Sequence, residues 1–207
     1  MKVLNLYAGI GGNRKLWEDV EVTAVEYDPK IAEVYQSFFP NDKVVVADAH
    51  QYLLDHYKEF DFIWSSPPCQ SHSRVRTMGV YNGNTKAIYP DMKLYQEIIF
   101  LQYFSKGRYV VENVRPYYKT LVPANVELHR HLFWTNFYIK HIKISDDRIH
   151  TEINQNSVVY GVDLSGKDIK SDLKQTMLKN MVNPELAKYI LDCARQEPEK
   201  QLTLEMK

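Results

Sequence analysis

A cysteine that directly follows an apolar run is the residue of this chain best placed for covalent chemistry. Residues 62–64 (FIW) predict a buried strand, and the two prolines at 67–68 cannot continue the interior of a sheet. Cys69 comes next, so we expect its thiol just beyond the carboxyl end of a strand, where open α/β sheets bind their ligands. A buried cysteine behind a turn has the same local sequence, but the rest of the chain favours a nucleophile.

A carboxylate within a second apolar run is the next candidate. Residues 108–114 (RYVVENV) predict a strand, and Glu112 stands near its carboxyl end. Burying a carboxylate is costly unless a partner compensates it. A structural ion pair would satisfy that need, but perturbed carboxylates gather at functional sites. We therefore favour a functional role for Glu112.

A glycine-rich segment near the start predicts a ligand-binding loop. Residues 2–8 (KVLNLYA) predict a strand, followed by the loop 9–12 (GIGG) and a helical stretch through Leu16 and Trp17. Glycines at such an exit let backbone N–H groups and a helix N-terminus approach a ligand closely. The next predicted strand, residues 21–28, carries Glu26 near its end, where a carboxylate can bind ribose hydroxyls. The loop lacks G-x-G-x-x-G spacing, so a mononucleoside ligand fits better than NAD.

The order of the predicted elements specifies the scaffold that positions these residues. Strands at 2–8, 21–28, 43–48 and 61–64 alternate with helices, among them 29–39 and 49–60. A helix at 91–107 capped by Asp91, strands at 108–114 and 125–137, and a closing helix at 184–194 follow. The alternation predicts an α/β fold with a doubly wound, mostly parallel sheet and helices on both faces.

Two internal stretches and the terminus lack a regular pattern. The polar segment from 70 to about 90 is long for a loop without structure of its own, which favours a mobile functional loop. Residues 138–175 are polar and irregular, and their pattern predicts no structure. The last dozen residues are charged, and we expect them to be frayed.

Length and composition fit one catalytic domain over residues 1–207. The 44% hydrophobic content is enough for a full core, and no second domain is required. The sequence has no apolar run of membrane-spanning length and no signal-peptide pattern at its start. Cys69 and Cys193 lack metal-ligand spacing, so we expect no metal site and a reducing compartment.

The net charge is zero, but its distribution is uneven. Residues 61–145 carry 11 Lys and Arg against 5 Asp and Glu, whereas the segments on either side are acidic. A basic surplus around Cys69 is typical of a nucleic-acid footprint, and a solvated surface face would explain it equally well.

Several motifs, taken in order, resemble those of the C5-cytosine DNA methyltransferases, which use S-adenosylmethionine. Residues 4–12 (LNLYAGIGG) resemble the cofactor loop, with Tyr7 where the family usually has Phe, and residues 25–28 (VEYD) resemble its acidic strand end. Residues 67–71 (PPCQS) resemble the nucleophile motif and residues 112–114 (ENV) the catalytic glutamate motif. The further resemblances are Asp48-Ala49 at the adenine contact, YPDMKLY at 89–95, HRHLFW at 129–134 and KNMVNPELAKYI at 179–190.

The resemblance implies a Rossmann-like class I methyltransferase with three groups of site residues. The implied catalytic residues are Cys69, Glu112 and Arg130. The implied cofactor-binding residues are Tyr7, Ala8, Gly9, Ile10, Gly11, Gly12, Glu26, Tyr27, Asp48, Ala49, Pro67, Leu94, Asn180, Met181 and Val182. The implied nucleic-acid contacts are Gln70, Ser71, Arg74, Arg76 and Lys86. The implied partner is DNA, as a duplex with a flipped cytosine or as a single strand, in the cytoplasm of a prokaryote or encoded by a phage.

The chain departs from the family pattern in two places. The arginine motif normally has two arginines one residue apart, but here Arg130 stands between His129 and His131, so the residue that holds the carbonyl of the base is open. The family also places a large target-recognition domain before the C-terminal motif. Here only residues 138–178 are available, which predicts a minimal recognition region.

Two alternative functions follow from the same motifs. One branch of the family methylates tRNA, so RNA is a possible substrate, although the PPCQ form favours DNA. The chain could instead be a non-catalytic module that binds cofactor or DNA beside a separate recognition subunit. The presence of both Cys69 and Glu112 argues against an inactive module.

Overall fold

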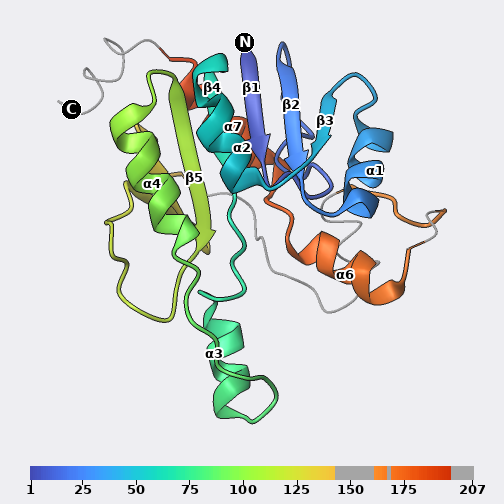
Figure 1. The fold of residues 1–207 in the computed structure, drawn as a ribbon, viewed down its shortest axis with the longest axis vertical. Coiled ribbons are helices and arrows are strands. Elements are labelled where there is room, and N and C mark those ends of the chain that lie inside the picture. The colour runs from blue at the N-terminus through green and yellow to red at the C-terminus, as the bar shows by residue number, and fades with distance from the viewer. Residues whose placement is uncertain (143–160, 167–168, 197–207) are drawn as a thin grey trace.

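One seven-stranded sheet, in the order β3-β2-β1-β4-β5-β7-β6, organises the computed structural model of the chain (Figure 1). The structure describes residues 1–142, 161–166 and 169–196. The parallel strands are β1 (Lys2–Leu6), β2 (Glu21–Glu26), β3 (Lys43–Val46), β4 (Phe62–Ser65) and β5 (Arg108–Val114). Strands β6 (Val126–Leu128) and β7 (His131–Thr135) are antiparallel to their neighbours. The predicted α/β fold with a mostly parallel sheet is confirmed.

Helices cover both faces of the sheet, as predicted. On one face α1 (Pro29–Phe38) and α7 (Pro184–Ala194) pack in a core that includes Val3, Phe62 and Val110 of the strands. On the other face α2 (Ala49–His56) and α4 (Lys93–Phe104) pack in a core with Leu4, Ile63 and other strand residues. The short 3₁₀ helix η1 (Tyr57–Glu59) follows α2, and α6 (Ser171–Lys179) precedes α7. Alternate strand residues therefore enter opposite cores, as the pleat requires.

The helix starts follow local sequence chemistry. The side chains of Asp28, Asp48 and Asn183 each accept a backbone N–H bond at the first turn of α1, α2 and α7. Proline occupies the first helical turn of α1 and α7, where its missing N–H costs no intrahelical bond. The caps Asp28 and Asp48 fix helix starts immediately after the exits of β2 and β3, and Asn183 fixes the start of α7 after α6.

The helix predicted after the glycine loop is wrong. Residues 12–16 form turns instead. The guanidinium of Arg14 donates to the carbonyl oxygen of Trp17, and Asp19 has a φ of 54°, which a right-handed helix cannot continue. Tertiary contacts of this loop therefore replace the expected helical turn.

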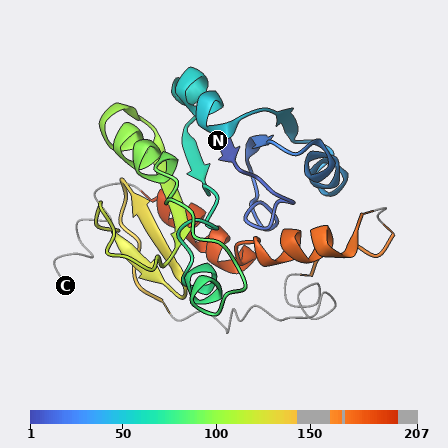
Figure 2. The same ribbon diagram turned by 60° about the horizontal axis from the view of Figure 1, so that its bottom comes forward.

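Two further segments differ from the prediction. The single strand expected at 125–137 is the hairpin β6–β7, because His129 has a φ of 58° and turns the chain between them. The loop expected at 70–90 contains α3 (Arg74–Tyr81), which Ser73 caps and which projects from the carboxyl end of the sheet (Figures 1 and 2). This helix buries none of its residues, so it has no amphipathic pattern to detect. Of the last dozen residues, predicted to be frayed, residues 197–207 lie outside the described residues.

Candidate active site and cofactor pocket

A cavity of about 1570 Å³ lies at the carboxyl ends of the parallel strands. Its wall includes residues that follow β1, β2, β3 and β4, the end of β5, the start of β7 and the segment after α6. An open α/β sheet binds ligands at this edge because successive loops meet there. All three predicted catalytic residues, Cys69, Glu112 and Arg130, line this cavity.

The three residues also interact electrostatically. Burial and, second, the negative charge of Glu112 raise the pKa of the Cys69 thiol to about 11, whereas the guanidinium of Arg130 lowers it. Glu112 is itself only 5% exposed. The thiol is therefore protonated at neutral pH in the free protein, and neutralising Glu112 would make its ionisation easier.

The cysteine segment is held against β5 by hydrogen bonds from side chains to backbone carbonyl oxygens. The side-chain amide of Asn113 donates to the carbonyl oxygen of Pro67 at 2.8 Å, and Asn113 is 1% exposed. Arg74 Nε, at the start of α3, donates to the carbonyl oxygen of Pro116, just beyond β5, at 3.0 Å. These bonds cross-link the segments that carry Cys69 and Glu112, which fixes the two functional groups in one wall.

His131 is a buried neighbour of Glu112 at this wall. It is 3% exposed, and its antiparallel register on β7 places it opposite Val114, two residues beyond Glu112. The sequence singled it out only as a neighbour of Arg130. Glu112 and Val114 lie on the same face of β5, because residues two apart on a strand share a face. The sequence alone, however, does not show that His131 of β7 pairs with Val114, because that register is fixed by the tertiary structure.

The glycine loop forms another part of the wall. Tyr7, Ala8, Gly9, Ile10 and Gly12 line the cavity. Gly9 has a φ of 55° and open space where a Cβ would lie, so its backbone is accessible to a ligand.

Two other glycine-loop positions are limited by packing. A Cβ on Gly12 would lie 2.9 Å from the side chain of Met181, and a Cβ on Gly11 would lie 2.3 Å from the ring of Phe39. Gly11 is therefore a core position and does not line the cavity.

Acidic residues stand at the ends of β2 and β3, as predicted. Glu26 accepts bonds from the backbone N–H groups of Gly9 at 2.9 Å and Asp28 at 3.0 Å, so it orders the loop while lining the cavity. Asp48 caps α2 and pairs with Lys93 at 3.2 Å. Its slight burial acts to raise the pKa of Asp48, but bonds from Lys93 and from backbone N–H groups of α2 lower it.

The remaining predicted cofactor residues divide into two groups. Tyr27, Ala49, Pro67, Asn180, Met181 and Val182 line the cavity. Leu94 does not: it is 3% exposed in the core between α4 and the sheet, although its neighbour Lys93 reaches the cavity. Lys93 was missed by the sequence reasoning, and adjacency to Leu94 was the signal that could have found it.

The donor set fits S-adenosylmethionine. The cavity offers an accessible glycine backbone at Gly9, a carboxylate at Glu26 for ribose hydroxyls and a second carboxylate at Asp48 for an exocyclic amine. The apolar surfaces of Ile10 and Val182 complete a nucleoside-sized wall. When bound, this group supplies an electrophilic methyl on a sulfonium.

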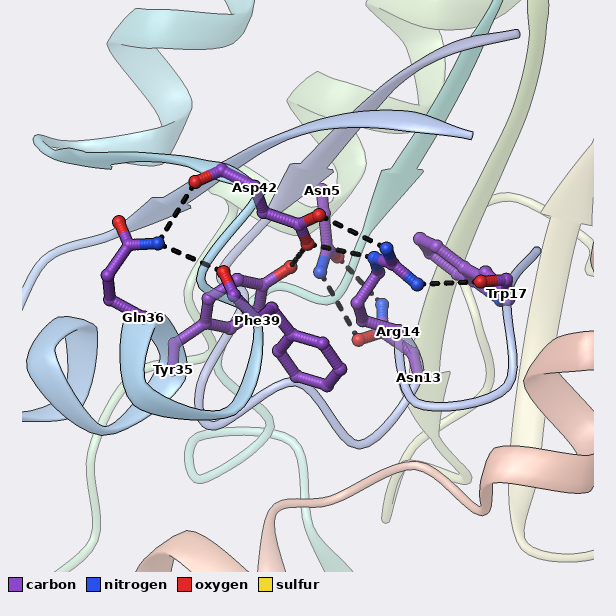
Figure 3. A network of polar contacts seen from close by, with 8 residues as sticks. All are labelled: Asn5, Asn13, Arg14, Trp17, Tyr35, Gln36, Phe39 and Asp42. Atoms are coloured by element: carbon purple, nitrogen blue, oxygen red, sulfur yellow. Dashed lines mark hydrogen bonds and ion pairs between the residues drawn. The ribbon is translucent and has the colours of Figure 1, made fainter. Parts of the chain in front are cut away.

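The glycine loop is supported from beneath by a buried polar network (Figure 3). Arg14 donates to Asp42 through Nε at 2.8 Å and Nη2 at 3.1 Å, and Tyr35 donates to the same carboxylate at 2.8 Å. Asn13 and Asn5 bond to each other through their side-chain amides. The network joins the residues after the loop to β1, to α1 and to the turn before β3, so the loop conformation depends on these three segments.

The predicted nucleic-acid contacts are partly brought together. Gln70, Arg74 and Arg76 line the cavity. Ser71 instead accepts a bond from the backbone N–H of Asp91, and the backbone carbonyl of Lys86 accepts a bond from Arg76. Arg115, Thr176 and Lys179 also line the cavity, and the sequence reasoning did not propose them. Residues 143–160 and 167–168 of the predicted recognition region 138–178 lie outside the described residues.

The described residues contain neither a metal-binding group nor a membrane-spanning helix. None of their His, Cys, Asp and Glu side chains forms a group that could hold a metal ion. Within the described ranges, no helix has the length and apolar character needed to cross a membrane.

Comparison with known proteins extends these observations. The human tRNA (cytosine(38)-C(5))-methyltransferase is 31% identical over 86 residues, which span 38% of this chain and 22% of the human protein. A solved DNMT2 variant of Spodoptera frugiperda is 27% identical, with 55% of this chain and 35% of that chain covered and a TM-score of 0.38. The methyltransferase EhMeth of Entamoeba histolytica shares the fold at a TM-score of 0.53 and 9% identity, covering 94% of this chain and 97% of its own.

A family model described as C-5 cytosine-specific DNA methylase matches residues 1–118. That span holds the glycine loop, Glu26, Asp48, Cys69 and Glu112, and it is more than half of the chain. The chain therefore belongs to the C-5 cytosine-specific DNA methylase family, whose methyl donor is S-adenosylmethionine.

Proposed function

We propose that this chain is a DNA (cytosine-5-)-methyltransferase that acts through a covalent cysteine adduct. The observation that carries the proposal is that Cys69, Glu112 and Arg130, from three separate segments, line one cavity with the glycine loop. The cavity thus has room for a cofactor and a base side by side. One domain over residues 1–207 is part of the proposal.

In this proposal Cys69 supplies the nucleophile. Cytosine C5 is a weak nucleophile, and addition of a thiolate to C6 turns the ring into an enamine whose C5 is reactive. The Cys69 thiol gives up its proton to solvent, the Sγ–C6 bond forms, and electron density moves from the C5–C6 double bond through the ring towards N3. Protonated Glu112 donates its proton at N3, which neutralises that charge.

Arg130 and the surrounding segments then orient the ring. A guanidinium at the O2 oxygen stabilises negative charge that develops there. Once C5 carries the methyl group that S-adenosylmethionine would supply, a base removes the C5 proton, the Sγ–C6 bond breaks to restore the aromatic ring and free Cys69, and N3 returns its proton to Glu112. While Glu112 is protonated it lacks the negative charge that raises the pKa of Cys69, so the thiol ionises more easily before the Glu112 proton moves to N3.

The target atoms are hidden inside a stacked duplex, so the base must be flipped out or already unpaired. Arg74 and Arg76 of α3 line the cavity and can contact phosphates beside such a base. The proposed partner is accordingly DNA, with a separate recognition subunit as the arrangement that would compensate for a short recognition region.

A second candidate substrate is tRNA, because the human relative with 31% identity is a tRNA (cytosine(38)-C(5))-methyltransferase. Transfer of tritiated methyl groups to plasmid DNA and to tRNA by the purified chain, followed by bisulfite sequencing, separates the two. Label in DNA, with the methylated cytosines protected from bisulfite conversion, supports the first proposal, and label confined to tRNA supports the second. Loss of label in the Cys69→Ser variant must accompany either result.

A further inference from the structure

A carboxylate buried beneath the cavity contacts the exits of two central strands. Glu97 of α4 is 1% exposed. Its Oε1 atom accepts a bond from the hydroxyl of Tyr7 at 2.5 Å, and its Oε2 atom accepts one from the hydroxyl of Ser65 at 2.5 Å. His50 Nδ1 lies 2.9 Å from Oε1. A carboxylate is costly to bury unless such partners compensate it, so three partners on one group form a defined arrangement.

The two hydroxyls come from segments with different tasks. Tyr7 follows β1 and begins the glycine loop, whereas Ser65 ends β4 and precedes the segment that carries Cys69. Leu6, just before Tyr7, pairs with Ser65 in the parallel ladder. One carboxylate therefore bonds to both strand exits where they separate towards the cofactor side and the nucleophile side.

The backbone at Tyr7 depends on such support. Tyr7 has a φ of 56°, a left-handed conformation that is uncommon for residues other than glycine. A conformation of this kind costs free energy and persists where surrounding contacts hold it. The hydrogen bond to Glu97 fixes the far end of the Tyr7 side chain, and the bond from Ala8 N–H to Val25 holds the chain immediately after it.

We propose that Glu97 is a positioning residue of the methyl-transfer site, whose carboxylate holds the exits of β1 and β4 in one arrangement and so orients the glycine loop for the cofactor. The proposal rests on the proposed function in taking S-adenosylmethionine as the ligand of the cavity. Glu97 and Ser65 do not line the cavity, so their effect on binding is transmitted through Tyr7.

Calorimetric titration of S-adenosylmethionine into the full chain tests this role. We expect Tyr7→Phe, which removes one hydroxyl, to weaken binding of S-adenosylmethionine by about fivefold. That loss corresponds to part of the free energy that a hydrogen bond to a charged group contributes. We expect Ser65→Ala to weaken binding by at least about threefold although Ser65 does not line the cavity. The double variant should weaken binding by a factor that differs from the product of the single effects, since the hydroxyls share one acceptor.

Matched controls use hydroxyls elsewhere. Tyr52→Phe on α2 and Ser105→Ala, whose hydroxyl bonds to Gly107 at the opposite end of β5, should bind like the wild type. Thermal unfolding without ligand gives a second readout. Glu97→Gln, which keeps the side-chain volume of Glu97, is the alternative variant if Tyr7→Phe or Ser65→Ala fails to fold. A lower unfolding temperature for Tyr7→Phe and Ser65→Ala with unchanged affinity would show a purely structural role and overturn the inference. A wild type that failed to bind would overturn the proposed function together with it.

Discussion

The Nε2 atom of His131 lies 3.5 Å from the Oε1 atom of Glu112, and both side chains are buried in the wall of the same cavity. Burial and, after it, the positive charge of Arg130 lower the pKa of His131 to about 3. His131 is therefore neutral at physiological pH and adds no positive charge beside Glu112. A cation at that position would stabilise the carboxylate form of Glu112, whereas the proposed proton donation to N3 requires its acid form.

The buried neutral His131 should make the protein less stable in mild acid. An unfolded chain protonates this histidine near pH 6.5, whereas the folded chain does so only near pH 3. The unfolded state binds more protons between these values, so stability falls as pH drops through that range. Relative to His131→Gln, the wild type should lose about 2 kcal/mol between pH 7.5 and pH 5.

Urea unfolding at the two pH values measures this difference. The variant His56→Gln, which changes an exposed histidine outside the cavity, is the control for histidine removal itself. Equal pH dependence of wild type and His131→Gln would show that His131 titrates normally in the folded protein.

Glu112→Gln should slow methyl transfer and also make Cys69 more acidic. The amide cannot donate a proton as the acid does, so the rate should fall by at least about a hundredfold. It also removes a charge that raises the pKa of the Cys69 thiol, so that pKa should fall below about 11. The pH dependence of iodoacetamide alkylation, followed on the Cys69 peptide by mass spectrometry, measures it.

The variant Arg130→Met offers a matched comparison of opposite sign. Removing its positive charge should move the alkylation midpoint of Cys69 to higher pH. If both variants shifted the midpoint in the same direction, the charges of Glu112 and Arg130 could not be what acts on the thiol.

Cys69→Ser should abolish methyl transfer and leave S-adenosylmethionine binding intact. In the proposed function Cys69 faces the base and the glycine loop binds the cofactor, and both line the cavity. Wild-type protein should also form a denaturant-resistant adduct with DNA containing 5-fluorocytosine, because fluorine cannot leave as a proton does. Loss of cofactor binding in a folded variant would remove Cys69 from the nucleophile role.

Asp42→Asn should destabilise the fold by about 3 kcal/mol, because it breaks a mostly buried ion pair and leaves the Arg14 guanidinium without a compensating charge. The side chains of Arg14 and Asp42 are 15% and 4% exposed. Lys188→Ala breaks the exposed pair with Asp192 on α7 and should change the free energy of unfolding by less than about 1 kcal/mol. Urea denaturation measures the free energy of unfolding of both variants. A similarly small decrease in both would show that the Arg14–Asp42 pair contributes no more than an exposed ion pair.

The recognised nucleotide sequence should be short, and binding to nucleic acid should depend on salt. Base-edge contacts read sequence, each discriminating by about 1–3 kcal/mol, whereas phosphate contacts only position the protein. Residues 138–178 can provide few such contacts, so we expect methylation in a context of two or three bases or on single strands, and binding that falls steeply with salt. Bisulfite sequencing of a treated plasmid measures the context. Complete methylation confined to one site of four to six bases would contradict this prediction, and near inactivity would support a separate recognition subunit.

Local patterns in the sequence determined most of the scaffold. The bounds of β5 and α7 were predicted to the residue, and β1, β2 and α1 to within two residues, because their apolar spacing and their Pro, Asp and Asn signals are local. The same patterns placed Cys69 after a strand exit and Glu112 near a strand end. The parallel order of the sheet then brings those two ends to one edge.

Tertiary structure alone decided the contacts between distant segments. Tyr7 and Glu97 are separated by 90 positions, and Asp48 and Lys93 by 45, so no local period relates them. Gly11 was predicted to bind the cofactor as part of the loop, but the ring of Phe39 occupies the space beside it. The pairing of His131 with Glu112 depends on the register of β5 and β7, since a strand fixes which residues share a face but not which residues of another strand lie opposite.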